Sequence, residues 1–68
     1  MSKPQRIRIL AYEGCQILDV TGPAAVFGAA NEVAGREVYD VDILSPAGGA
    51  VLTNCGVALQ SHRIGGQP

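Results

Sequence analysis

The sequence has few of the residues that stabilise a very small domain. Its 68 residues include two cysteines, one histidine and no tryptophan. A disulfide scaffold needs more cysteines than this, and a structural zinc site needs four ligands that Cys15, Cys55 and His62 do not supply. We therefore predict no metal site and no cofactor, and we expect both thiols to be reduced.

Charge is also sparse, at 16% of residues with a net charge of −1. The one basic cluster, Lys3, Arg6 and Arg8, is shorter than the like-charge runs that form nucleic-acid-binding tails, so we expect a solvated chain start. No stretch approaches the roughly 20 apolar residues of a membrane span. These absences predict a cytoplasmic protein that contacts neither DNA nor membrane through these residues.

The composition that remains is that of a globular interior. Hydrophobic residues make up 47% of the chain, which argues against intrinsic disorder. A chain of this length, however, buries only about 60% of the surface that its unfolded form exposes, so a core built by these residues alone is marginal.

The first half predicts a strand, a helix and a second strand. The apolar run Ile7–Tyr12 indicates a strand at about 6–12, buried on both faces as in a parallel sheet, and the alternation in Tyr39–Ser45 indicates a strand at 39–45. Between them we expect a helix at about 18–34. Pro23 suits the first helical turn, so the helix should start at Thr21–Gly22 after a loose turn.

This helix should place one apolar face on the sheet and end at a glycine. Val26, Ala30 and Ala34 recur at helical spacing, with Phe27 and Val33 beside them. Gly35 follows as the residue that ends the helix.

The second half predicts a small β-hairpin at about 50–60. Two β-prone runs, 51–53 and 57–59, flank the turn residues Asn54-Cys55-Gly56. The fold class is therefore α/β, a βαβ unit followed by a hairpin. One helix cannot cover both faces of a parallel sheet, so we expect residues 1–68 to be an incomplete N-terminal portion of a larger domain, or else an extensive oligomer.

Asp19 has two open interpretations. It is an acid beside a predicted helix N-terminus, where the helix dipole stabilises a negative charge by about 0.3–1 kcal/mol. It also lies near the carboxyl end of the first strand, the edge at which open α/β sheets bind ligands. Glu13, Gly14 and Gly22 are expected at the same edge. Their spacing fits neither a dinucleotide fingerprint nor a phosphate loop.

Neither cysteine is expected to be a nucleophile. Cys15 has no base near it in the sequence, so a small apolar packing role is favoured. Cys55 lies in the predicted hairpin turn, away from any other thiol.

The segments "IRILAYEGCQILDVTGPAAVFGAAN" and "YDVDILSPAGGAVLTNCGVAL" resemble the start of the ThiJ/PfpI superfamily. That superfamily has a class I glutamine amidotransferase-like fold of the flavodoxin type. The resemblance runs from Arg6 to about Arg63. It is most specific at Leu18–Pro23, and the Ser45–Gly49 turn and the spacing of Thr53 and Gly56 add a second match.

Two branches of the superfamily share this pattern. One comprises AraC-type transcriptional regulators with an N-terminal ThiJ/PfpI-like domain that senses a small molecule and a C-terminal helix-turn-helix domain. Phe27–Asn31 and Ser45–Gly49 are more similar to this branch. The alternative is the isonitrile hydratase-like enzymes, or another cysteine-dependent enzyme of the superfamily.

The resemblance implies a pocket acid at Asp19. In enzymatic relatives this acid lies beside a cysteine nucleophile on a strand-to-helix elbow further along the chain, and neither Cys15 nor Cys55 matches that elbow. The 68 residues alone are therefore expected to be inactive. The implied partners are a small-molecule effector or substrate, DNA only through a missing C-terminal domain, and a second copy in a full-length homodimer.

Overall fold

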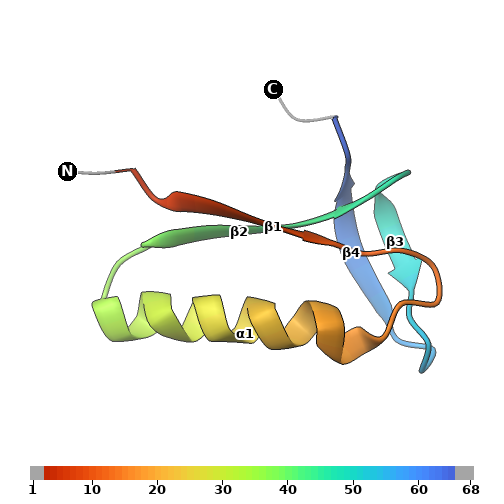
Figure 1. Cartoon of the computed structure of the whole chain (residues 1–68), viewed down its shortest axis with the longest axis horizontal. Helices are drawn as coiled ribbons and strands as arrows, with labels where there is room; N and C mark the ends of the chain where they lie inside the picture. Colours follow the sequence, from red (N-terminus) through yellow and green to blue (C-terminus); the bar gives the residue numbers. More distant parts are fainter. Residues whose placement is uncertain (1–2, 66–68) are drawn as a thin grey trace.

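In the computed structural model, residues 3–65 form a small α/β domain with a mixed sheet of four strands and one helix (Figure 1). The elements are β1 (Gln5–Leu10), α1 (Ile17–Ala34), β2 (Tyr39–Ser45), β3 (Gly49–Leu52) and β4 (Ala58–Arg63). The strand order is β1-β2-β4-β3, parallel except for the β3–β4 hairpin. The α/β class and the expected order of elements are confirmed.

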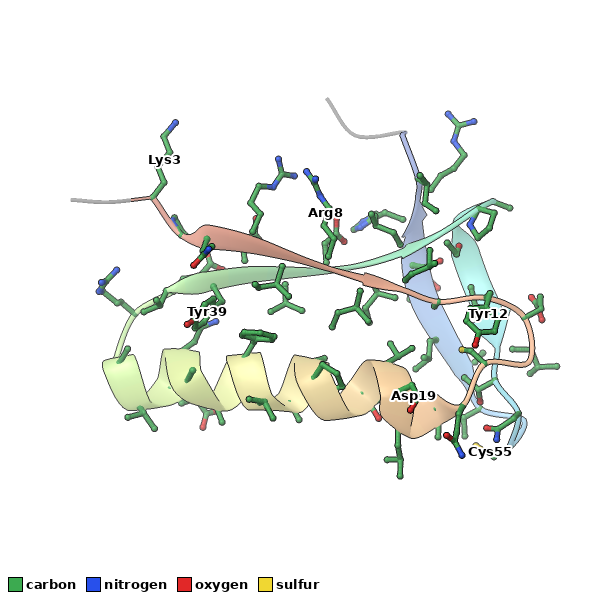
Figure 2. The ribbon with its side chains drawn as sticks, viewed as in Figure 1. Lys3, Arg8, Tyr12, Asp19, Tyr39 and Cys55 are labelled. Atoms are coloured by element: carbon green, nitrogen blue, oxygen red, sulfur yellow. The ribbon has the colours of Figure 1, made fainter. Side chains whose placement is uncertain are left out.

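The prediction that the first strand is buried on both faces is wrong. β1 pairs with β2 from Gln5↔Tyr39 to Leu10↔Leu44, and α1 lies along one face of this pair (Figure 1). Ile9 packs against the core beneath it. Arg6 and Arg8 are exposed, and Arg8 points away from α1 (Figure 2). Residues of β1 alternate between half-buried and exposed from Arg6 to Leu10. They do so because, within residues 3–65, a helix covers one face of the sheet and leaves the other face open.

The helix begins earlier than Pro23 indicated. α1 covers Ile17–Ala34, which confirms the expected bounds of about 18–34. Pro23 therefore lies inside the helix, and the start at Thr21–Gly22 that its position indicated is wrong. The extra turn carries Val20, which is 1% exposed, and burial of this side chain outweighs the local preference of proline. The Thr21 hydroxyl also donates to the carbonyl of Ile17. Gly35, with φ 70°, ends the helix as expected.

The predicted inner face of the helix is wrong in part, because its members Phe27 and Ala30 are half-buried whereas its valines are exposed. Val26 and Val33 are 66% and 89% exposed. Val20 is buried, Ala24 and Phe27 are half-buried, and the Phe27 ring contacts the Tyr39 ring of β2 edge-on at 4.8 Å. Both sides of α1 are apolar, so helical spacing alone does not identify the side that packs on the sheet.

The core lies where the carboxyl ends of the strands meet the start of the helix. Its buried members are Ala11, Cys15, Val20 and Val51, with Ile9, Ile43 and Leu59 packed against them. The packing role predicted for Cys15 is confirmed. No helix within residues 3–65 combines the length and hydropathy needed to cross a bilayer.

Asn31 connects the end of α1 to the start of β2. Its Oδ1 accepts the backbone N–H groups of Val38 at 2.8 Å and Tyr39 at 2.9 Å, and its Nδ2 donates to the carbonyl of Tyr39 at 2.9 Å. One amide side chain thereby satisfies three backbone groups and fixes the angle at which the chain enters β2.

The predicted hairpin is confirmed and extends beyond residue 60. β3 and β4 pair from Gly49↔Ser61 to Leu52↔Ala58, whereas β4 pairs with β2 at just two register positions, Leu44↔His62 and Ser45↔Arg63. On the sheet face opposite α1, His62 Nδ1 lies 2.6 Å from Asp42 Oδ1 and adds a side-chain link between β2 and β4.

We predict that Asn31→Ala lowers the free energy of unfolding by about 1–3 kcal/mol, because it leaves two backbone N–H groups and one carbonyl without their partner. Urea denaturation of the 68-residue chain would measure this. The matched control is Glu32→Ala, the exposed neighbour on the same helix, which should change stability by less than about 0.5 kcal/mol. Equal midpoints for the two variants would contradict the structural role of Asn31.

Candidate functional site

A half-open pocket of about 200 Å³ lies at the carboxyl ends of β1 and β2. The loop after β1 forms one wall, and the turn from β2 into β3 forms the other. The lining residues are Tyr12, Glu13, Ser45, Pro46, Ala47, Gly48, Ala50 and Val51. This is the edge at which open α/β sheets bind ligands.

A chain of hydroxyl hydrogen bonds connects the pocket-lining residues Ser45 and Gly48 to β4. Ser61 Oγ donates to the carbonyl of Gly49 at 2.7 Å, and Ser45 Oγ accepts the backbone N–H of Gly48 at 2.9 Å. The two hydroxyl oxygens are 2.6 Å apart. Since Ser61 has one proton and uses it toward Gly49, Ser45 is the donor to Ser61. Both side chains are buried, and this pairing leaves the Ser45 proton unavailable to a ligand.

Gly48 allows the wall to lie close to β4. Its φ is +73°, and a Cβ at this position would meet the backbone nitrogen of Arg63 at 2.9 Å. A side chain there would therefore be both strained and in collision with backbone. The glycine sets how closely the β2–β3 turn approaches the end of β4.

The loop after β1 is fixed to the hairpin by its backbone. The Gly14 N–H donates to the carbonyl of Leu52 at 2.8 Å, and the Asn54 N–H donates to the carbonyl of Cys15 at 2.9 Å. Gly14, with φ +79°, makes the turn that allows this, and it is not among the pocket-lining residues. Glu13, immediately before it, does line the pocket.

Asp19 lies on the first turn of α1 and is exposed (Figure 2). Its carboxylate has no hydrogen-bond or ion-pair partner among residues 3–65, and it does not line the pocket. Gly22 is half-buried one turn further along the helix and also lies outside the lining. Of the four residues expected at the ligand edge, the structure brings Glu13 into the pocket.

The two cysteines, both within the described residues, are free thiols in different surroundings. Cys15 is buried in the core. Cys55 is exposed on the β3–β4 turn (Figure 2). A side-chain hydrogen bond between Thr53 and Cys55, with Oγ1 at 3.5 Å from the sulfur, and a backbone hydrogen bond at Val57 hold the pKa of the Cys55 thiol below its usual value. Neither sulfur lines the pocket.

The pocket lining offers few polar side chains to a ligand. Its polar side chains are the Glu13 carboxylate, the Tyr12 phenol and the Ser45 hydroxyl, which is already hydrogen-bonded to Ser61. The remaining lining residues are largely apolar. Within residues 3–65 no group of three or more His, Cys, Asp or Glu side chains could hold a metal ion.

Sequence reasoning missed the contribution of Ser45 and of the turn that follows it. The signal was present, because Ser45 ends the second parallel strand and carboxyl ends of parallel strands share one edge. Its buried partner Ser61 is 16 residues away and gives no local pattern.

Comparison with curated proteins finds the "Uncharacterized protein in cpoL 5'region" of Streptomyces lividans, which is 35% identical over 54 residues. The match covers 79% of this chain and 37% of the relative, so the chain spans well under half of that protein. No family model matches the chain, and no solved structure matches it.

We predict that Ser45→Ala and Ser61→Ala each lower the free energy of unfolding by about 1–3 kcal/mol, because each leaves buried polar groups unpaired. The double variant should lose less than the sum of the two, by about 0.5–3 kcal/mol, since both changes remove one shared contact. Urea denaturation of the four proteins measures this coupling. Gln60→Ala, an exposed neighbour on β4, is the control. Strict additivity would contradict the hydroxyl chain.

We predict that Cys55 reacts with iodoacetamide faster than an ordinary exposed thiol near neutral pH, because its lowered pKa increases the thiolate fraction. Thr53→Val should raise this pKa and slow the reaction near neutral pH, while the two rates converge at strongly alkaline pH. Thr53→Ser keeps the hydroxyl and is the matched control. Cys15 should stay unmodified while the chain is folded. Equal rate profiles for the valine and serine variants would contradict this assignment.

Proposed function

We propose that this chain is the N-terminal portion of a ThiJ/PfpI-like, flavodoxin-type domain that senses a small molecule in an AraC-type transcriptional regulator. The order of elements and the parallel β1–α1–β2 unit followed by a hairpin support this fold. In this proposal the regulator is cytoplasmic, and DNA is bound by a helix-turn-helix domain outside residues 1–68.

The apolar outer side of α1 supports the proposal that a larger domain or a second copy covers this helix. Leu18, Val26 and Val33 are all strongly exposed, and small residues lie between them. A helix that is apolar all round is typical of helices buried on every side in larger proteins. The proposed full-length protein is a homodimer.

The observation that carries the sensing function is a pocket at the ligand edge of the sheet without an accessible nucleophile from the described residues. Cys15 is buried, Cys55 is on the far turn of the hairpin, and the Ser45 hydroxyl is held by Ser61. This arrangement supports a role in binding a small molecule, and it is the basis of the sensing proposal.

Asp19 favours a second candidate, an isonitrile hydratase-like or other cysteine-dependent enzyme. Its exposed carboxylate has no partner among residues 3–65 and is free to work beside a group from elsewhere in a longer chain. A carboxyl group held near a thiolate can donate a hydrogen bond and act as a general acid.

The full-length protein distinguishes these functions. For the regulator we expect a downstream helix-turn-helix domain, DNA binding that responds to an effector, and no turnover in either the parent protein or Asp19→Ala. The matched control is Glu32→Gln, an acid near the end of the same helix. A downstream elbow cysteine together with turnover that Asp19→Ala abolishes and Glu32→Gln preserves would refute the regulator and establish the enzyme.

A further inference from the structure

The polar groups around the pocket are suited to a positive charge. Glu13 is the charged side chain among the described lining residues, and it forms no ion pair or hydrogen bond within residues 3–65. No lysine, arginine or histidine lines the pocket in this part of the chain. An anion would therefore meet an unopposed carboxylate, whereas a cation would gain an attractive charge pair.

The hydroxyl chain removes donors that could serve an anionic ligand. The Gly48 N–H is donated to Ser45, the Ser45 proton goes to Ser61, and the Ser61 proton goes to Gly49. What remains exposed is chiefly the Glu13 carboxylate and the Tyr12 side chain. The face of an aromatic ring attracts cations, and Tyr12 is next to Glu13 in the pocket lining.

The rest of the lining sets the size and polarity of the ligand. Pro46, Ala47, Ala50 and Val51 give an apolar wall. The volume of about 200 Å³ is below the roughly 300–1,000 Å³ of pockets for drug-sized molecules. It is comparable to the roughly 150 Å³ that accommodates a benzene ring. The pocket thus fits one small apolar group and a single charged substituent.

We propose that this pocket binds a small organic ammonium ion. Its apolar part packs on the wall formed by Pro46, Ala47, Ala50 and Val51, and its ammonium group pairs with Glu13. This proposal rests on the sensing function proposed above and specifies the chemical class of the effector.

The test is a set of amide chemical-shift titrations on the full-length protein with three probes of nearly the same shape: benzylammonium, benzyl alcohol and benzoate. Benzylammonium should shift the amides of Ala47, Gly48 and Ala50 and bind most tightly, with benzoate weakest. Glu13→Gln should reduce its affinity by about three- to tenfold, to that of the alcohol. Glu37→Gln, an exposed acid on the α1–β2 loop with the same change in net charge, should stay within about twofold of the parent protein.

The outcomes separate this proposal from the one on which it rests. If benzyl alcohol or benzoate binds at these amides as tightly as benzylammonium, or if Glu13→Gln and Glu37→Gln behave alike, the ammonium proposal is overturned while a sensing pocket stands. If no probe shifts these amides, the ammonium proposal is overturned, whereas the regulator is refuted by the turnover experiment on the full-length protein described above. The amide spectrum of each variant verifies that it retains the parent fold.

Discussion

The contact between the Ser45 and Ser61 hydroxyls holds three strands together at one point. Ser45 ends β2, Ser61 lies in β4, and their outer bonds go to Gly48 and Gly49 at the start of β3. β2 and β4 share just two register pairs, so their ladder alone is a weak connection. The buried hydroxyl chain, together with the backbone bond from Ile64 to the Ser45 carbonyl, supplies the remaining connection. The pocket wall has its position because this junction is fixed.

Elements with local signals could be predicted from the sequence. Gly35 ended the helix as its conformational freedom suggested, and the alternation in residues 39–45 gave β2 its observed bounds. Pro23 misled because its local preference was weaker than the burial of Val20 one turn before it. The packing side of α1 could not be predicted, since the helix has apolar residues on both sides.

The position of the candidate site in the fold was predictable from the sequence, but most of the residues that line it were not. The rule that ligands bind at the carboxyl edge of a parallel sheet placed Glu13 at the edge where the pocket lies. It did not identify Ser45, Gly48 or Val51, because their contribution depends on how β4 pairs with both β2 and β3. Pairing between strands that are distant in the sequence depends on the whole fold, so it cannot be predicted from any short segment.

Carboxylates give the carboxyl edge of the sheet a negative charge, whereas the start of the helix alone would give it a partial positive charge. The first turn of an α-helix is a ready site for anions, because its free N–H groups and dipole attract negative charge. In this chain Asp19 occupies that turn, and Glu13 lies in the loop that leads to it. The chain's own carboxylates therefore stand where a phosphate or carboxylate ligand would bind in other α/β proteins. With no basic side chain among the described pocket residues to offset the Glu13 charge, this edge of the sheet repels anions more than neutral or cationic molecules.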